Sequence, residues 1–384
     1  MNKKNILIIS FSHLKNDPRV FRQIFNLQIQ GYNITAMGLS NPEIDNITFI
    51  KVDKTENLAF KLIFAFCLLF HLYELYYWNL RIIKQSLKKT KNLNFDLIIA
   101  NDLDTLALAC KIKSKTNCKI LYDAHEYSPK EHEDKLIWNI LFKDYINYTL
   151  LNYISNVDKM FTVCEGIAQE YEKNFNINPI VVTNATEYCD ILPKLNNDSN
   201  IKLIHHGGSI RSRKIENMIL MMDYLDKRFI LDLMLVPSDK RYHKKLKNLA
   251  NSRSNVKIID PVPMKNIVNF ISSYDIGLYI LEPTNFNNGM ALPNKIFEFI
   301  QARLAIAIGP SPEMKKIVKK YNLGVISDDY NAKSLASKLN SLNYTDILKF
   351  KSSADVAAKE LNSENNVNLI LNTVKELIPS NLHN

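Results

Sequence analysis

The feature that most constrains the fold is a repeated local pattern: a short apolar run, a loop, and a segment with helical spacing. The first run, Asn5–Ser10, is almost continuously apolar, as expected for a strand buried on both faces. Asp17 and Pro18 then form a helix start, and Gly31 is a suitable C-terminal cap. Strands that alternate with helices predict a parallel sheet covered by helices on both faces.

The pattern runs through the chain twice, on either side of a polar break at 190–200 that contains Pro193. The expected strands are 33–37, 96–100, 119–122, 159–163 and 180–183 before the break, and 201–205, 231–236, 255–259, 276–280 and 305–308 after it. A chain of 384 residues exceeds what one core comfortably fills.

We therefore predict an α/β protein with two Rossmann-like, doubly wound domains that face a central cleft. The first domain covers 1–189, the linker 190–200, and the second domain 201–350. Residues 351–384 are expected to be a helical segment that either stays with the second domain or crosses back to the first. Ligands of such sheets bind at the carboxyl ends of the strands, so the residues that follow the strands are the candidates for function.

Composition narrows the partners and the compartment. The formal net charge of +10 indicates anionic partners, such as nucleotide phosphates or anionic lipid. No nucleic-acid-binding motif is present, so we expect no nucleic-acid partner. The five cysteines show no CxxC spacing, which argues against disulfides and zinc and is typical of the reducing cytoplasm. The N-terminus enters a strand directly, without the pattern of a signal peptide.

The most apolar part of the chain, 59–80, has the composition of a helix that lies on a membrane surface. Lys61, His71 and Glu74 interrupt it, and the uncharged stretch is too short to span a bilayer. Its aromatic residues and the basic cluster in 81–91 favour attachment to anionic lipid, on the inner face of the cell membrane. The alternative is a helix buried against the sheet or in a subunit interface.

Two adjacent glycines, Gly207 and Gly208, follow an expected strand and precede an expected helix. Their backbone amides can approach a phosphate closely, and the N-terminus of the helix would face the negative charge. Arg211, Arg213 and Lys214 follow at once, and cations there match a diphosphate leaving group. The alternative is a tight turn with a solvated basic face.

A second candidate ligand-binding segment begins where Pro293 and Asn294 mark the start of a helix. The amides of this turn and Lys295 are suited to phosphate oxygens. Glu298, one turn later in an otherwise apolar helix, needs a partner such as ribose hydroxyls. The alternative is a surface glutamate favoured by the helix dipole.

In the first domain, His125 follows the expected strand 119–122. A histidine there can orient a sugar hydroxyl or polarise the reacting centre, with Glu126 or Asp123 fixing its tautomer. The alternative is a structural loop histidine.

Two further strand ends carry charged side chains. Asp17 and Arg19 follow the first strand, and Asp102 follows 96–100. In a crevice these side chains would meet the acceptor of a reaction. Otherwise Asp17 is only an N-cap and Arg19 only a solvated side chain.

Five motifs occur in a familiar order: NDPRV, ANDLDTLA, YDAHE, HHGG followed by basic residues, and LPNKIFE. From about Asn5 to Leu339 the chain resembles the retaining GT-B glycosyltransferases of family 4, especially those of capsule, O-antigen lipopolysaccharide and exopolysaccharide pathways in bacteria. The resemblance implies transfer of a sugar, as by a hexosyltransferase, from a UDP- or GDP-sugar to a glycan or lipid-linked acceptor. The second domain would hold the donor, and the first would lie on the acceptor side.

The resemblance also implies roles for individual residues. The donor would be bound by Gly207, Gly208, Arg213, Lys214, Asn294, Lys295 and Glu298. Either Arg213 or Lys214 aligns with the phosphate lysine of the family, and Glu298 matches the second glutamate of its E-x7-E motif, which holds the ribose. The reacting centre would involve His125, Asp17 and Glu126, with Arg19 and Asp102 on the acceptor side.

One departure from the family stands at Met290, where the first glutamate of the motif is expected. Asn287, Asn288 or amides near Ala291 would then have to contact the donor sugar. No metal-binding motif stands at a suitable position, so we expect no cofactor and no metal, with cations carrying the charge of the leaving group.

Retention of configuration without an obvious nucleophile fits a front-face mechanism, as the family implies. Two alternatives stay open at this point. One is a nucleotide-sugar epimerase on the same fold, and the other is a non-catalytic partner in a polysaccharide assembly complex.

Overall fold

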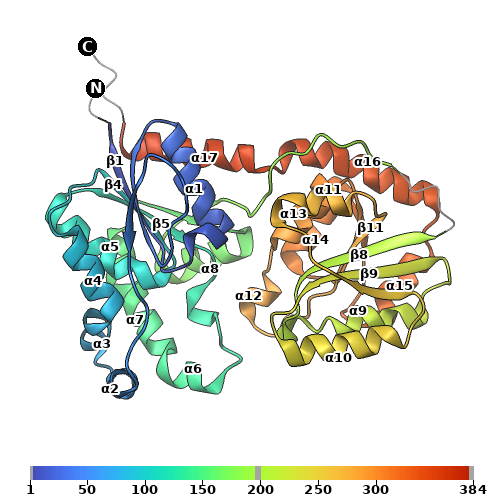
Figure 1. The fold of residues 1–384 in the computed structure, drawn as a ribbon, viewed down its shortest axis with the longest axis horizontal. Helices are drawn as coiled ribbons and strands as arrows, with labels where there is room; N and C mark the ends of the chain where they lie inside the picture. Colours follow the sequence, from blue (N-terminus) through green and yellow to red (C-terminus); the bar gives the residue numbers. More distant parts are fainter. Residues whose placement is uncertain (1–2, 195–199, 380–384) are drawn as a thin grey trace, which may run out of the picture. The chain divides into compact units, whose positions relative to one another are not determined.

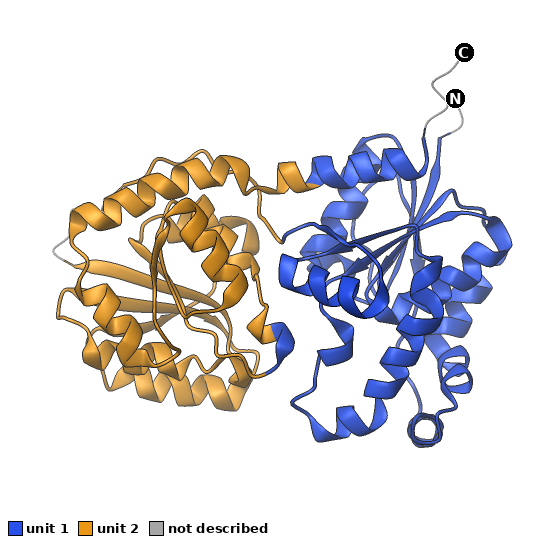
Figure 2. Ribbon diagram, turned by 180° about the vertical axis from the view of Figure 1, so that it is seen from behind, with its two compact units in different colours: residues 1–183, 285–287, 367–384 blue, residues 184–284, 288–366 orange. Residues whose placement is uncertain are grey.

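The computed structural model describes residues 3–194 and 200–379, which form two compact units (Figures 1 and 2). Within these residues, unit 1 comprises 3–183, 285–287 and 367–379, and unit 2 comprises 184–194, 200–284 and 288–366. The units divide after Thr183, inside the range assigned to the first domain from the sequence. Residues 1–2, 195–199 of the expected linker and 380–384 lie outside the described residues.

Unit 1 is built on a parallel sheet with the strand order β3-β2-β1-β4-β5-β6-β7. Its strands are β1 Asn5–Ile9, β2 Asn33–Gly38, β3 Thr48–Lys51, β4 Leu97–Asn101, β5 Lys119–Ala124, β6 Lys159–Thr162 and β7 Ile180–Val181. The central strands are buried along nearly their whole length, which explains their continuous apolar sequences. The strand β3 was not predicted, because this short edge strand is mostly solvent-exposed and lacks an apolar run.

The helices of unit 1 connect these strands in order. They are α1 Pro18–Ile29, α2 Leu58–Leu69, α3 Tyr73–Asn79, α4 Arg81–Thr90, α5 Leu103–Thr116, α6 Leu136–Leu141, α7 Lys143–Tyr153 and α8 Glu165–Phe175. The predicted start of α1 is confirmed, because the Asp17 carboxylate accepts a hydrogen bond from the backbone amide of Val20. Leu371 and Val374 of the last helix, α17 Ser363–Leu377, complete the core of this unit beside β1 and α1.

The sequence predicted one helix over the apolar stretch 59–80, and this prediction was wrong. It forms α2 and α3, and the chain turns between them at His71, which has a positive φ of 57°. Phe64, Cys67 and Leu68 of α2 are buried, while most of its other apolar side chains are exposed. Within the described residues, no helix is both long enough and apolar enough to cross a membrane.

Unit 2 repeats the architecture with the parallel strand order β10-β9-β8-β11-β12-β13. Its strands are β8 Ile201–Gly208, β9 Phe229–Val236, β10 Val256–Ile259, β11 Ile276–Tyr279, β12 Ala305–Ile308 and β13 Gly324–Ile326. Its helices are α9 Glu216–Met221, α10 Lys240–Asn251, α11 Ile267–Ile271, α13 Asn294–Gln301, α14 Pro312–Tyr321, α15 Ala332–Asn340 and α16 Tyr344–Glu360, and α12 Phe286–Gly289 is shared with unit 1. The predicted α/β class with two parallel sheets is confirmed.

Candidate functional site

The first group of candidate residues lies at the carboxyl ends of the neighbouring strands β4 and β5 of unit 1. Asp102 follows β4 and His125 follows β5. The Asp102 carboxylate lies 3.3 Å from Nδ1 of His125 and accepts a 3.2 Å hydrogen bond from its backbone amide. Nε2 of His125 lies 3.7 Å from Asp123 Oδ2 and has no hydrogen-bond partner among the described residues. Asp102 therefore orients the imidazole. Of the two partners expected from the sequence, Asp123 lies beside the ring, whereas Glu126 makes no such contact.

The electrostatics of His125 follow from these neighbours. Burial lowers the pKa of His125, but the carboxylates of Asp102 and Asp123 outweigh this effect, and the net pKa lies above the usual value. With Nδ1 held by Asp102 and Nε2 buried near Asp123, the imidazole is fixed in place while about a fifth of its side chain stays exposed.

Arg19 does not take the acceptor-side position expected from the sequence. Its guanidinium binds both oxygens of Asp123, at 2.8 and 2.7 Å, and donates a 2.6 Å hydrogen bond to the carbonyl of Val182. Burial raises the pKa of Asp123, yet Arg19 and His125 more than offset this and hold the pKa well below its usual range. Since Arg19 is only 8% exposed, its role here is to position Asp123 beneath His125.

Asp17 is committed to local structure as well. One carboxylate oxygen caps α1, and the other accepts a 2.8 Å hydrogen bond from the hydroxyl of Ser12. This corresponds to the N-cap alternative of the sequence analysis.

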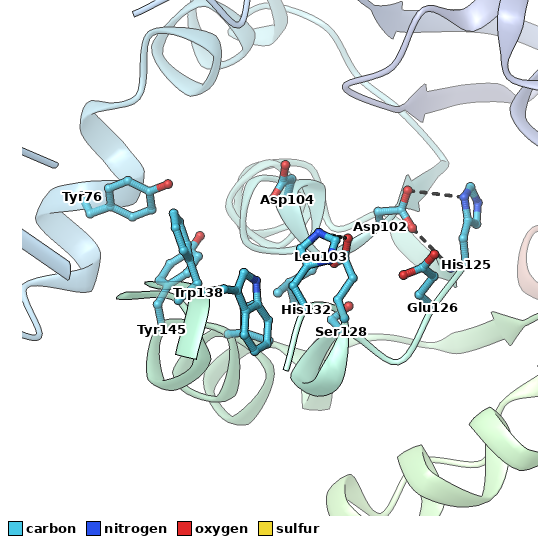
Figure 3. A pocket seen from close by; sticks show the side chains of 13 residues that line it. Tyr76, Asp102, Leu103, Asp104, His125, Glu126, Ser128, His132, Trp138 and Tyr145 are labelled. Atoms are coloured by element: carbon cyan, nitrogen blue, oxygen red, sulfur yellow. Dashed lines mark hydrogen bonds and ion pairs between the residues drawn. The ribbon is translucent and has the colours of Figure 1, made fainter. Parts of the chain in front are cut away.

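Beside His125 lies a pocket of about 450 Å³, lined entirely by residues of unit 1 (Figure 3). One end carries the aromatic side chains of Tyr76, Trp138 and Tyr145, and the other carries Asp102, His125 and Glu126. The aromatic end was not predicted, because the segment from 131 to 153 contains no recognisable motif. The one feature of the sequence that could have indicated a sugar-binding pocket there is its unusual content of Trp and Tyr beside acidic residues.

The second group of candidate residues lies in unit 2, where β8 and β11 are neighbours and the strand order reverses. Gly207 has a φ of +133°, which side-chain-bearing residues rarely adopt. The position that a Cβ would occupy there lies 3.4 Å from Lys295 Nζ and 3.5 Å from a terminal nitrogen of Arg213. Two cations therefore converge on the bare backbone of this glycine.

Lys295 lies in the first turn of α13 and is only 6% exposed. Its ammonium group sits 3.8 Å above the ring centroid of Tyr279 and has no hydrogen-bond partner among the described residues. Burial lowers the pKa of Lys295 well below its usual value, and the charge of Arg213 lowers it further. A buried lysine without a hydrogen-bond partner, beside an arginine, has the chemistry to bind an anion.

The immediate surroundings of Gly207 differ from the sequence expectation in two ways. Gly207 and Gly208 belong to β8 and pair with β9, and the next α-helix begins only at Glu216, after a 3₁₀ turn. The prediction that a helix begins directly after the two glycines was therefore wrong. Lys214 forms an ion pair with Glu282, so Arg213, not Lys214, accompanies Lys295 at Gly207.

Glu298 lies one turn after Lys295, on the helix that begins at Asn294 as expected. One of its carboxylate oxygens lies 3.3 Å from Nε2 of His206. Burial, reinforced by Lys295, lowers the pKa of His206 to about 3, so this imidazole is neutral near pH 7. Glu298 was predicted to need a polar partner, and the neutral imidazole of His206 is one polar group that the protein places beside it.

Met290 stands where the family has a glutamate, and the structure shows that two of the residues predicted to take over its role, Asn287 and Asn288, form other hydrogen bonds. Both ends of the Asn287 amide bind the backbone of Tyr127, at 2.8 and 3.1 Å, so Asn287 is engaged in unit 1. The Asn288 amide donates to the hydroxyl of Thr284. Within the described part of the chain, no group of three or more His, Cys, Asp or Glu side chains is arranged to hold a metal ion.

No protein-family model and no curated protein matches the sequence. The structure, however, is similar to solved glycosyltransferase structures. HepE from Anabaena in complex with UDP and glucose has a TM-score of 0.70 at 11% identity, and the match covers 97% of this chain and 100% of that one. A glycosyltransferase from Rickettsia africae has a TM-score of 0.68 at 15% identity, covering 99% and 100%.

Sucrose-phosphate synthase from Thermosynechococcus elongatus has a TM-score of 0.71 at 13% identity, covering 98% of this chain and 99% of that one. Identities this low show a shared fold and leave the activity to be argued from the site. The chain has the GT-B fold of these glycosyltransferases.

Proposed function

We propose that the protein is a retaining glycosyltransferase. It transfers a sugar, most simply a hexose, from a UDP- or GDP-sugar to a glycan or lipid-linked acceptor in the synthesis of bacterial surface polysaccharide. The fold supports this proposal, and so does the fact that HepE was solved with UDP and with UDP-glucose. The order of the sequence motifs supports the retaining, surface-polysaccharide type.

The observation that carries the proposal is the buried ammonium group of Lys295, converging with Arg213 on Gly207. An unpaired buried cation is costly to a fold unless a ligand neutralises it. A diphosphate supplies the charge, and the absence of a side chain at Gly207 leaves room for its oxygens. Glu298 would accept hydrogen bonds from the ribose hydroxyls.

In the reaction, the bond between the anomeric carbon and the β-phosphate oxygen breaks, and negative charge builds up on the departing nucleotide. Lys295 and Arg213 stabilise that charge, so no metal ion or other cofactor is required. The acceptor hydroxyl attacks from the same face, and its proton passes to a phosphate oxygen of the leaving nucleotide. The products are the nucleoside diphosphate and the glycosylated acceptor with retained configuration.

His125 serves the acceptor side of this reaction. Asp102 holds its Nδ1, and the exposed part of the imidazole would lie against the sugar near the reacting carbon. Glu126, which lines the same pocket, would accept a hydrogen bond from the acceptor. Asp17 and Arg19 act through the backbone and through Asp123, as positioning residues.

We also propose that unit 1 attaches to the inner face of the cell membrane. The helix α2 packs against both α3 and α6 at one end of unit 1 (Figure 1). They carry the exposed side chains that we call the apolar face: Leu58, Phe60, Leu62, Ile63, Phe66, Leu69, Leu75, Leu136, Ile137 and Ile140. Exposed lysines of α4, which packs against α3, complement anionic lipid.

The proposed reaction is tested by incubating the protein with UDP- and GDP-sugars, with and without glycan acceptors, and measuring release of the nucleoside diphosphate. Lys295→Ala and Arg213→Ala should abolish turnover. Arg211→Ala removes a nearby exposed cation that pairs with Asp239 at 2.7 Å, and should leave turnover intact. Turnover that survives in both Lys295→Ala and Arg213→Ala would contradict the proposal. An epimerised donor formed without acceptor would favour an epimerase.

A further inference from the structure

The pocket of unit 1 has a wall of aromatic rings that are fixed before any ligand arrives. The rings of Tyr76 and Tyr145 meet edge to face with their centroids 5.0 Å apart, and Trp138 meets His132 edge to face at 6.2 Å. Trp138 and Tyr145 are less than a tenth exposed, so their orientation is set by packing. Such a wall offers a flat apolar surface to the C–H face of a sugar ring.

The rest of the pocket is acidic. Asp102, Asp104, Glu126 and Glu131 line it, and no Lys or Arg is among the described residues that do so. Burial and the neighbouring carboxylates raise the pKa of Glu131 to about 7, with Lys135 opposing this rise. Burial and the charge of Lys135 lower the pKa of His132, whereas the carboxylates of Asp102 and Asp123 raise that of His125.

We propose that this pocket binds the terminal sugar of the acceptor and selects an uncharged or amino sugar over an acidic one. The inference rests on the proposed function and names the chemistry of its acceptor. Hydroxyl groups can donate to the carboxylates while the ring lies on the aromatic wall. A uronate or phosphate group in the same space would face the carboxyl groups of Asp102, Asp104 and Glu126, joined above about pH 7 by the ionised carboxylate of Glu131.

The pocket also has two chemically different ends. Its aromatic end lies away from His125, and its polar end contains the His125–Asp102 pair (Figure 3). A sugar stacked at the aromatic end would therefore extend its hydroxyl groups toward Asp102 and Glu126 at the polar end.

Direct binding of simple sugars tests the inference. The chain has two tryptophans, so Trp78→Phe leaves Trp138 as the only fluorophore of its kind. We expect a saturable change in Trp138 fluorescence with the methyl glycosides of glucosamine and of glucose, the former binding at least as tightly. The methyl glycoside of glucuronic acid should bind at least about tenfold more weakly than that of glucose.

Removal of one carboxylate should relax the selection. In the Trp78→Phe background, at a pH above about 7 where Glu131 is ionised, Glu131→Gln should strengthen glucuronoside binding on the order of tenfold relative to glucoside binding. The control Glu172→Gln removes a carboxylate from α8, outside the pocket, and should change neither.

Two results would overturn the inference: a glucuronoside that binds as tightly as the glucoside, or no saturable response to any of the three sugars. Nucleotide binding is measured on the same samples. Nucleotide binding without sugar binding would defeat the inference alone, while sugar binding without nucleotide binding would defeat the proposed function alone.

Discussion

Replacing Lys295 by methionine should stabilise the protein without ligand while weakening its binding of nucleotides. Methionine has nearly the length of the lysine stem and leaves no buried, unpaired donor. A buried donor without a partner costs about 1–3 kcal/mol, so Lys295→Met should recover free energy of that order. For a domain of roughly 150–250 residues, about 2–4 °C accompanies each kcal/mol, which predicts a rise in Tm of roughly 2–12 °C.

The same substitution removes a charged hydrogen bond to the diphosphate, worth about 1.5–3 kcal/mol. That loss weakens binding roughly 10- to 100-fold. With ligand at about 100 times the wild-type Kd, the wild type gains about 2.7 kcal/mol of stability from the ligand. The variant should gain only about 0.4–1.4 kcal/mol under the same conditions. Thermal unfolding with and without UDP measures both effects in one experiment.

The matched control is Lys351→Met, also in unit 2. Lys351 is 1% exposed, but its ammonium group donates a 2.7 Å hydrogen bond to the carbonyl of Tyr274. Its replacement should destabilise the protein by about 1–3 kcal/mol, because that carbonyl loses its donor, and should leave UDP binding unchanged. A Lys295→Met variant that loses stability, or that binds UDP like the wild type, would refute the reasoning.

Three further predictions follow from other parts of the molecule. Because the folded-state pKa of Lys295 is depressed, the stability of the ligand-free protein should rise with pH between that pKa and 10.5. Calorimetry in two buffers should also show proton uptake when UDP binds in this pH range. The absence of proton uptake would contradict the assignment of Lys295 to the diphosphate. Asp102→Asn should lower the pKa of His125 in an NMR titration. The substitution should also reduce the stabilisation from the His125–Asp102 pair, which is present below about pH 6.5 and lost as pH rises through the raised pKa. An unchanged pKa would contradict the pairing. Ile137→Ser should reduce sedimentation with anionic vesicles several-fold, while Val356→Ser, at another exposed apolar residue in unit 2, should not; equal effects would count against the apolar face.

The fold could be predicted largely from sequence because buried parallel strands are continuously apolar. β1, with Ile6 to Ile9 fully buried, is the clearest case. The edge strands β3 and β13 escaped prediction because half-exposed strands carry no such signal. The division of 59–80 into two helices also escaped, since the turn at His71 has no glycine or proline to mark it.

The candidate site could be predicted only as far as strand ends identify it. His125 and Lys295 were found because one follows a strand and the other lies in the first turn of a helix, and Gly207 was found because it is one of two adjacent glycines at the carboxyl end of a strand. The sequence does not show which side chains from distant parts of the chain contact one another. Arg19 was expected on the acceptor side of a crevice, yet it binds Asp123, which lies 104 positions away in the chain. Asp102 was expected to meet an acceptor, yet it contacts His125.

The most direct measurement of the central claim is a crystal structure of the protein with UDP. The account predicts a phosphate oxygen within hydrogen-bond distance of Lys295 Nζ, with Arg213 on the same diphosphate and the backbone of Gly207 beside it. A diphosphate bound elsewhere, with the Lys295 ammonium group still over the ring of Tyr279 and without an anion, would contradict it.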